Sequence, residues 1–196
     1  SSLGFGRRYV APLLSQFVTR YPKVTIRFDT IDKMQDLVEQ HVDLDIHIGN
    51  EIAPNLIAKK LANNRRILCA SPHYLQKFGG PKRLEELLNH RCLIIQERDT
   101  PYALWKLNSL KGEQQITISG QLSSNNGELV HQWALEGQGI MLRSLWDIQE
   151  ELAQGELIHI LDNYWQDADI WAIYPTRLNN SAKLKSCVQF LEKEIP

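Results

Sequence analysis

The amino-acid sequence predicts an α/β fold with two lobes, and three observations support this. Segments in which apolar residues recur at helical spacing alternate with short apolar runs that are typical of buried strands. Such alternation favours parallel or mixed sheets with helices on both faces. The chain has 196 residues, which is long enough for two small lobes, each with its own core. The number of expected elements suits two lobes as well.

The first third of the chain begins with an amphipathic helix. Apolar residues from Val10 to Tyr21 fall on one helical face, and Pro22 ends the helix. The patterns that follow predict a strand, a short helix, a buried strand and two strands that turn at Asn63-Asn64: 24–28, 34–38, 44–48 and 56–70. This part therefore alternates helices with strands.

The rest of the chain continues the alternation. Ser71-Pro72 marks a helix start, because serine caps a helix N-terminus and proline fits the first helical position. Next come a short helix, a strand, a hairpin that turns at Lys111-Gly112, and then helix, strand, helix and strand: 83–89, 92–96, 103–120, 128–136, 140–142, 145–153 and 157–161. An apolar strand over 169–175 and an amphipathic helix over 181–193 complete the chain.

Gly137 and Gly139 raise the question of a nucleotide-binding loop. In a dinucleotide fingerprint the glycines follow a strand and open a helix. Here the order is reversed, because a helical pattern precedes the glycines and a short apolar run follows them. The sequence therefore favours a joint, with Gly137 just after the helix and Gly139 at the entry to the strand.

Composition excludes a DNA-binding surface and a membrane segment. The 22 lysines and arginines nearly balance 23 acidic residues, so these residues provide no basic field to hold DNA. No apolar run approaches the roughly 20 residues that a membrane helix needs. The 3 cysteines are odd in number and widely spaced, which suits a reducing compartment. We therefore expect a cytoplasmic protein with no membrane partner.

Three polar stretches are candidates for ligand binding, namely "SSLGFGRR", "SSNNGE" and "LRS". Ligands of α/β sheets bind at the carboxyl ends of strands, where helix N-termini point. Side chains there donate hydrogen bonds to an anion such as a carboxylate. For each stretch, helix capping or a solvated charge is the alternative. The expected ligand-binding residues, each at a strand end or a helix start, are Ser1, Ser2, Thr30, Gln96, Asn125, Asn126 and Arg143.

Catalytic motifs are scarce. Six histidines are scattered without metal-ligand spacing, and the sequence has no GxSxG elbow, HExxH motif or P-loop. A Ser/His/Asp arrangement can assemble at long range, but nothing in the sequence points to one. We therefore expect no enzyme activity, no catalytic residues, no cofactor and no metal.

Several stretches, in this order, resemble the effector-binding (regulatory) domain of LysR-type transcriptional regulators. They are "PLLSQFVTRYPKVTIRF", "DLVEQHVDLDIHIG", "LCASPHYL", "SSNNGELVHQWALEGQGIMLRSLWDIQEELAQGELIHIL" and "DIWAIYP". The resemblance covers nearly the whole chain. Its most specific pieces are "FVTRYPKVTI", "VDLDIHIG" and the helix, GxGI, strand, helix and GxLI pattern around Gly137.

This resemblance implies two Rossmann-like subdomains, similar to type 2 periplasmic binding proteins and joined by two crossover strands near 68–71 and 168–172. Subdomain I would hold residues 1–67 plus 171–196, and subdomain II residues 68–170. A small effector would bind between the lobes. Promoter DNA would be bound only through a winged helix-turn-helix, which with its linker helix is absent from this chain.

The resemblance also implies an isologous homodimer, with a tetramer in the full-length protein. The helices over 10–21 and 145–154 carry apolar residues on more than one face, and each would pack against the other helix of a partner chain. The expected interface residues are Leu14, Phe17, Val18, Tyr21, Trp146 and Gln149. Alternatively, these residues serve only the core of their own chain.

Two rival functions share this fold. A periplasmic-type solute-binding protein would carry an export signal, and unpaired cysteines would be unusual in it. A small-molecule enzyme would need a nucleophile or an acid/base pair in the cleft, with shifted pKa values. His41 and His47 stand where the related branch usually has glycine and arginine, so ligand contacts from that strand are not transferred.

Overall fold

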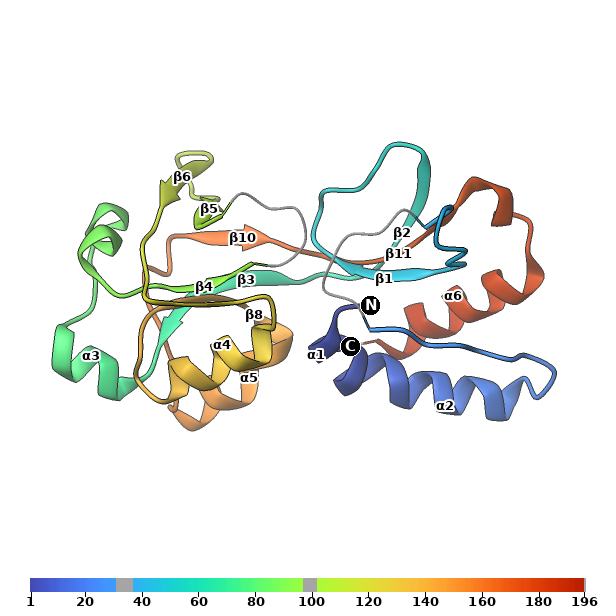
Figure 1. The fold of residues 1–196 in the computed structure, drawn as a ribbon, viewed down its shortest axis with the longest axis horizontal. Coiled ribbons are helices and arrows are strands. Elements are labelled where there is room, and N and C mark those ends of the chain that lie inside the picture. The colour runs from blue at the N-terminus through green and yellow to red at the C-terminus, as the bar shows by residue number, and fades with distance from the viewer. Residues whose placement is uncertain (31–36, 97–101, 196) are drawn as a thin grey trace. The chain divides into compact units, whose positions relative to one another are not determined.

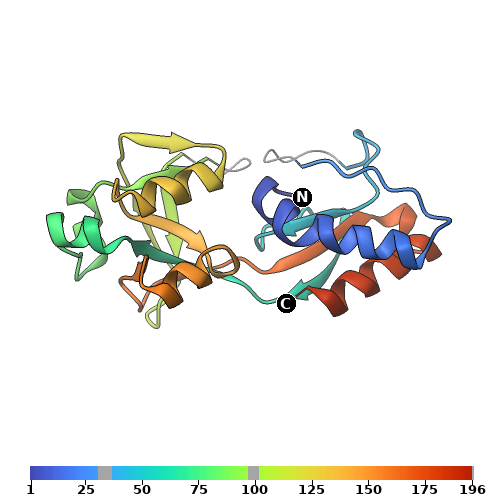
Figure 2. The same cartoon turned by 90° about the horizontal axis from the view of Figure 1, so that it is seen from below.

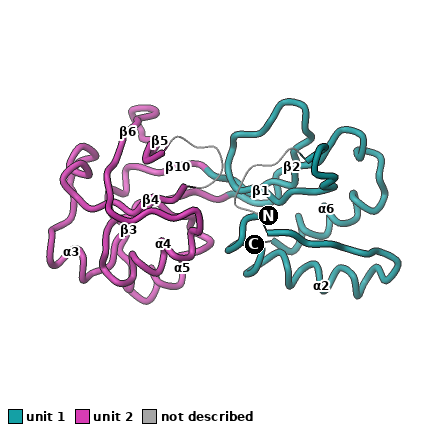
Figure 3. Tube along the Cα trace, in the orientation of Figure 1, with its two compact units in different colours: residues 1–63, 168–196 teal, residues 64–167 magenta. Residues whose placement is uncertain are grey.

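A computed structural model of the chain describes residues 1–30, 37–96 and 102–195. The chain folds into two compact units, each of which mixes helices with strands (Figures 1 and 3). Unit 1 holds Ser1–Asn63 and Ala168–Pro196, and unit 2 holds Asn64–Asp167. The α/β class predicted from the sequence is confirmed.

Unit 1 contains one antiparallel sheet and two main helices. Its helical elements are α1 (Leu3–Phe5), a π-type turn (Gly6–Val10), α2 (Ala11–Arg20), a 3-10 turn (Thr176–Leu178) and α6 (Ala182–Glu194), and its strands are β1 (Asp45–Ile48), β2 (Leu56–Ala62) and β11 (Ile170–Pro175). The strand order is β1-β11-β2, and β11 pairs antiparallel with both neighbours. Helices α2 and α6 lie on the same side of this sheet (Figure 1).

The core of unit 1 joins α2 to α6. Phe17 is 1% exposed, and its ring centroid lies 5.4 Å from that of Phe190 in α6 and 4.6 Å from that of Tyr21. Leu184, Val188 and Leu191 of α6 are buried, as their spacing in the sequence predicts. The Phe17 side chain is buried within its own chain and has almost no exposed surface for a partner chain. This corrects the expectation that Phe17 contacts a partner chain.

Residues 24–28 differ from their prediction. Their apolar alternation predicts a strand, but the structure assigns them none. A strand requires a hydrogen-bonded neighbour, and no strand in the described part of the chain pairs with this segment. The helix expected at 34–38 falls largely on residues outside the described ranges, and the neighbouring residues 37–41 form turns.

Unit 2 is larger. Its helical elements are α3 (Pro72–Phe78), a 3-10 helix (Leu84–Asn89), α4 (Gly127–Leu135) and α5 (Leu145–Gln154), and its strands are β3 (Arg65–Ala70), β4 (Leu93–Ile95), β5 (Leu104–Leu107), β6 (Gln114–Thr117), β7 (Leu122–Ser124), β8 (Met141–Ser144), β9 (Ile158–His159) and β10 (Trp165–Asp167). Strand β3 pairs antiparallel with β8, β9 and β10. Strands β4 and β7 pair in parallel, and β5 and β6 form the predicted hairpin.

The central strands of unit 2 are buried on both faces. Along β3, Ile67 and Cys69 enter a core with α4 and α5, whereas Leu68 and Ala70 enter a second core with α3 and the β5–β6 hairpin. Figure 2 shows α4 and α5 beside these strands from a second direction. Burial on both faces explains why the segment around β3 reads as a continuous apolar run.

The joint at Gly137 matches its prediction. Helix α4 ends at Leu135, and Gly137 follows with φ +76°, the left-handed conformation that favours glycine after a helix. A Cβ on Gly139 would lie 2.6 Å from the carbonyl oxygen of Arg91, so only glycine fits at the entry to β8. The glycines therefore shape a backbone joint.

The two chain crossings between the units differ from their predicted positions. The sequence predicts that 56–70 turns back on itself at Asn63-Asn64, but β2 pairs with β11 in unit 1 while β3 pairs with strands of unit 2. The chain therefore passes from unit 1 to unit 2 between Asn63 and Asn64, and it returns to unit 1 between Asp167 and Ala168. These borders replace those expected after residue 67 and before residue 171, because β3 belongs to the sheet of unit 2.

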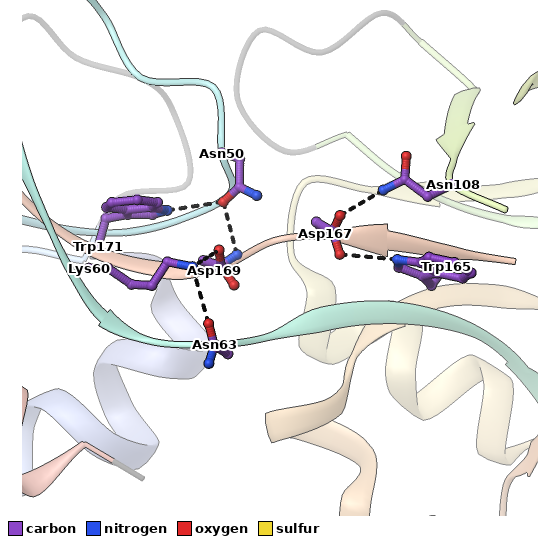
Figure 4. A network of polar contacts seen from close by, with 8 residues as sticks. All are labelled: Asn50, Lys60, Asn63, Asn108, Trp165, Asp167, Asp169 and Trp171. Carbon is purple, nitrogen blue, oxygen red and sulfur yellow. Dashed lines mark hydrogen bonds and ion pairs between the residues drawn. The ribbon is translucent and has the colours of Figure 1, made fainter. Parts of the chain in front are cut away.

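Polar contacts hold the chain on the unit 2 side of the return crossing (Figure 4). Asp167 accepts hydrogen bonds from Asn108 Nδ2 at 2.8 Å and from Trp165 Nε1 at 3.1 Å. Asn108 and Trp165 also exchange backbone hydrogen bonds at 2.6 and 3.1 Å. The Asp167 carboxylate is thus tied to its own unit by two side-chain donors.

A second set of contacts holds the unit 1 side (Figure 4). Asn50 Oδ1 accepts hydrogen bonds from the Asp169 backbone N at 3.1 Å and from Trp171 Nε1 at 3.0 Å. Lys60 Nζ lies 2.5 Å from Asp169 Oδ2 and donates to Asn63 Oδ1 at 3.1 Å. Ala168, between Asp167 and Asp169, is fully buried. The residues on the two sides of the return crossing are therefore each held by side chains of their own unit.

We expect Phe17→Ala to lower the free energy of unfolding by about 3 to 5 kcal/mol, because it leaves a cavity in the core that joins α2 to α6. Gln16→Ala, at an exposed position next to it, is the control and should cost much less. Urea unfolding followed by circular dichroism measures both values. Equal losses in the two variants would contradict the assignment of Phe17 to the core.

Candidate functional site

Polar side chains gather at one edge of unit 2, where β4 and β7 end. The two strands pair in parallel, with Leu93 opposite Leu122 and Ile95 opposite Ser124. The carboxyl ends of parallel strands meet at the same edge of a sheet. Gln96 therefore lies beside β7, and its backbone N donates a hydrogen bond to the Ser124 carbonyl at 2.9 Å. The structure thus brings Gln96 together with the residues that follow β7.

The loop after β7 leads into the N-terminus of α4. Ser124 Oγ accepts a hydrogen bond from Asn126 N at 3.0 Å, and Asn126 Oδ1 accepts one from Glu128 N at 2.9 Å. Asn126 is therefore a helix cap, which is the alternative that the sequence left open. Asn125 is exposed in the same loop. Of the two asparagines, Asn125 is the one exposed at this surface.

Arg143 reaches the same end of α4 from β8. The residue is 6% exposed. A Cβ on Gly127 would lie 2.0 Å from Arg143 Nη1 and 2.6 Å from Cζ, so the guanidinium lies against the bare Cα of Gly127. The ring of Trp146 has its centroid 5.8 Å from Cζ. A fixed positive charge therefore lies at the N-terminal end of a helix, which is the end that attracts anions.

The charge of Arg143 is compensated inside unit 2 by a cluster of ionisable side chains. Asp147 Oδ2 lies 2.5 Å from Arg143 Nε and 3.2 Å from His131 Nδ1. His131 Nε2 lies 3.5 Å from Glu151 Oε1. The four side chains come from β8, α4 and α5, and all are mostly buried. A buried guanidinium requires such partners, because burying an unpaired charge is costly.

The environment of Asp147 lowers its pKa. Burial by itself raises the pKa of this carboxyl group, because it disfavours the charged form. The hydrogen bond from His131 and the positive charge of Arg143 act in the opposite direction and outweigh burial, so that the pKa lies below the ordinary value of 3.8. Asp147 is therefore ionised at neutral pH and forms a true ion pair with Arg143.

The other three predicted residues lie in unit 1, around the start of its N-terminal helix. The Ser1 amino group lies 3.4 Å from the Asp29 carbonyl oxygen. Ser2 precedes α1, but its side chain makes no capping hydrogen bond. Thr30 is exposed, and its Cγ2 lies 3.1 Å from the position of a Cβ on Gly6. Ser1, Ser2 and Thr30 thus belong to one region of unit 1.

Metal and thiol chemistry find no support in residues 1–30, 37–96 and 102–195. No group of three or more His, Cys, Asp or Glu side chains in these ranges is placed to hold a metal ion. Burial raises the pKa of the Cys92 thiol to about 12 and that of Cys187 to about 11. Burial also raises the pKa of Cys69. Burial therefore favours the protonated form of all three thiols at neutral pH.

Every helix in the same ranges is shorter than the roughly 20 residues of a membrane-spanning helix. None of these helices is long and apolar enough to cross a bilayer. The longest is α6, with 13 residues, and only one of its faces is apolar.

The sequence identifies Arg143 as a candidate but not its partners. Asp147 follows Arg143 by four residues, and opposite charges at this spacing are a signal that local analysis can detect. His131 lies on another helix, and no local spacing relates it to Asp147. Gly127 gives no sequence signal either, because its role depends on a guanidinium that arrives from β8.

Known proteins match the chain over its whole length. A model of the family described as "LysR substrate binding domain" matches residues 1–196. The chain is 52% identical over 193 residues to the HTH-type transcriptional regulator DmlR of Escherichia coli strain K12, which covers 98% of this chain and 63% of DmlR. It is 47% identical over 190 residues to the HTH-type transcriptional activator TtdR of the same strain, covering 97% of this chain and 61% of TtdR.

A solved structure matches as well. The regulatory domain of CrgA, a LysR-type transcriptional regulator from Neisseria meningitidis, is 27% identical and superposes with a TM-score of 0.81, covering 100% of this chain and 96% of that chain. This likeness confirms the expected resemblance to type 2 periplasmic binding proteins. The chain spans less than two thirds of the length of DmlR and TtdR.

The pKa of Asp147 predicts a pH-dependent contribution to stability. Because the folded-state pKa is lower than the ordinary 3.8, the contribution is complete above about pH 4 and is lost as the pH falls through the folded-state pKa. The difference in unfolding free energy between wild type and Asp147→Asn should therefore be constant near neutral pH and shrink below about pH 4. Glu156→Gln, at an exposed position, is the control. A difference that stays constant down to about pH 2 would exclude the ion pair.

Proposed function

The chain belongs to the LysR substrate-binding domain family, and from this premise we propose that it is the ligand-sensing domain of a LysR-type DNA-binding transcriptional regulator. Its relatives DmlR and TtdR are a transcriptional regulator and a transcriptional activator. In this proposal the domain binds a small effector, and promoter DNA is contacted by a helix-turn-helix elsewhere in the full-length protein. The near-balance of basic and acidic residues supports a chain that does not hold DNA itself.

The proposed effector is a small anion, and a carboxylate is the class we expect. The observation that carries this is the Arg143 guanidinium beside Gly127, at the N-terminus of α4. A guanidinium and a helix N-terminus both favour negative charge, and together they recognise a carboxylate well. Gln96 and Asn125 lie at the same edge of unit 2. The roles of Ser1, Ser2 and Thr30 stay a prediction.

A binding role fits the chemistry of the described residues better than catalysis. The three thiols are protonated at neutral pH, and the carboxylate of Asp147 is bound to Arg143 and His131. We therefore propose that the domain is not an enzyme and uses no cofactor. We also propose that it works in the cytoplasm, since its cysteines are free thiols.

The proposed assembly is a two-fold homodimer, with a tetramer in the full-length protein. Helix α2 of one chain would pack against α5 of the other, and the symmetry would repeat this contact. On α2, Leu14 and Val18 are partly exposed although they are apolar. The proposed interface residues are now Leu14, Val18, Tyr21, Trp146 and Gln149. Phe17 is left out because it is buried in its own chain.

Binding of a carboxylate should depend on Arg143. A thermal-shift screen of small carboxylates and aromatic acids identifies the ligand, and calorimetry then measures its affinity. Arg143→Ala should weaken binding by about 1.5 to 3 kcal/mol, the value of a charge-assisted hydrogen bond. Arg143→Lys keeps a positive charge beside Asp147, so it tests binding without leaving that carboxylate unpaired. Arg83→Ala, at an exposed arginine of the same unit, is the control.

The outcomes are distinct. Unchanged affinity in both Arg143 variants would reject the role of this residue. Loss of affinity in the Arg83 variant as well would show an effect of overall charge. Loss that is confined to Arg143 supports an anion at the N-terminus of α4.

The dimer predicts a specific effect of charge on α2. Leu14→Glu should sediment as a folded monomer, because a carboxylate in a buried apolar contact is costly. Gln16→Glu adds the same charge to the same helix, but residues two apart on a helix face different directions, so this variant should remain dimeric. Analytical ultracentrifugation distinguishes the two. A dimeric Leu14→Glu variant would reject the proposed interface.

A further inference from the structure

The guanidinium of Arg143 is held in one orientation by contacts on two sides. On one side, Asp147 Oδ2 lies 2.5 Å from Nε, the nitrogen inside the side chain. A hydrogen bond at Nε fixes the rotation of the planar group and so determines where its two terminal nitrogens point. The guanidinium lies against Gly127 with Nη1 nearest, since a Cβ there would lie 2.0 Å from Nη1, 2.6 Å from Cζ and 2.8 Å from Nη2.

Asp147 is itself held in place by His131. The oxygen that contacts Arg143 Nε also lies 3.2 Å from His131 Nδ1, and the other ring nitrogen, Nε2, faces Glu151 at 3.5 Å. The contact of Nδ1 with Asp147 orients the imidazole, whereas Nε2 makes no hydrogen bond to any described residue although Glu151 lies nearby. Because His131 is on α4 and both carboxylates are on α5, the cluster links the two helices beneath the guanidinium.

Gly127 completes the arrangement from the opposite side. It is the first residue of α4, and its φ angle is not in the left-handed region, so the backbone accepts any L residue. The conflict at this position is with the arginine side chain, which occupies the space of a Cβ. Glycine is therefore required here by the guanidinium and not by the backbone.

We propose that Asp147 and His131 are positioning residues, and that together with glycine at position 127 they hold the Arg143 guanidinium at the N-terminus of α4 in the orientation that binds an anionic effector. This inference rests on the proposed function for the effector, but the placement of the guanidinium is a property of the chain alone. Neither Asp147 nor His131 contacts the effector in this scheme.

Two measurements on the 196-residue chain test the proposal. Nitrogen-15 NMR of arginine side chains reports the Nε–H of Arg143, which is assigned by its loss in Arg143→Lys. Calorimetry with succinate and with benzoate as probes reports anion binding. A hydrogen bond to a buried carboxylate should give a slowly exchanging Nε–H in the wild type.

The variants separate positioning from stability. Asp147→Asn should shift the Arg143 signal and weaken binding of the tighter probe at least about tenfold, the effect of one charge-assisted hydrogen bond. Gly127→Ala should do the same with no loss of melting temperature, because alanine favours a helix and only the guanidinium is displaced. His131→Leu should resemble Asp147→Asn, whereas His131→Asn, which keeps an amide donor near the position of Nδ1, should stay near wild type. Glu156→Gln is the control, because it removes one negative charge, as Asp147→Asn does, but at an exposed position.

The possible outcomes test the positioning role and the anionic effector separately. An Arg143 signal that is unchanged in Asp147→Asn and in Gly127→Ala overturns the positioning role, and so does a shifted signal with unchanged affinity. Loss of affinity only in parallel with a lower melting temperature, in Gly127→Ala as well, also overturns it. If neither probe binds the wild type, succinate and benzoate are excluded as effectors, and the NMR signals still decide whether Asp147, His131 and Gly127 hold the guanidinium.

Discussion

Burial of the central strands of unit 2 on both faces constrains where the charged side chains of this unit can lie. Alternate residues of β3 enter two separate cores, one with α4 and α5 and one with α3 and the β5–β6 hairpin. A polar group that enters either core therefore needs partners there, because an unpaired polar group in a core would be costly. Gln96, Asn126 and Arg143 all lie at strand ends or helix starts.

Arg143 shows how a charge is accommodated under this constraint. Its side chain leaves β8 next to a core, and it is compensated by Asp147 one turn into α5. A buried ion pair contributes little net stability unless its remaining hydrogen-bonding groups are also satisfied. The additional contact from His131 is consistent with this requirement, and so is the lowered pKa of Asp147. A pair of this kind is better explained by the orientation it imposes on the guanidinium than by stability alone.

The topology then decides which polar residues meet. Parallel pairing of β4 and β7 places Gln96 beside the loop that caps α4, although the two segments are far apart in the chain. On either side of the return crossing, the carboxylates of Asp167 and Asp169 are each bound within their own unit.

The sequence by itself determined the local elements, because their signals lie within four residues of one another. Pro22 ends the first helix, Ser71 and Pro72 begin α3, and Gly137 follows α4, all as predicted. The family could also be predicted, from the order of such local patterns along the chain. Only the tertiary structure decided the pairings over long distances in the sequence. These include the crossing of the chain at Asn63-Asn64, the absence of a strand at 24–28, the burial of Phe17 against Phe190, and the contacts of Arg143 with Gly127 and of Asp147 with His131. The physical reason is that hydrogen bonding between strands and compensation of a buried charge depend on which segments fold next to each other, and residue spacing does not encode that.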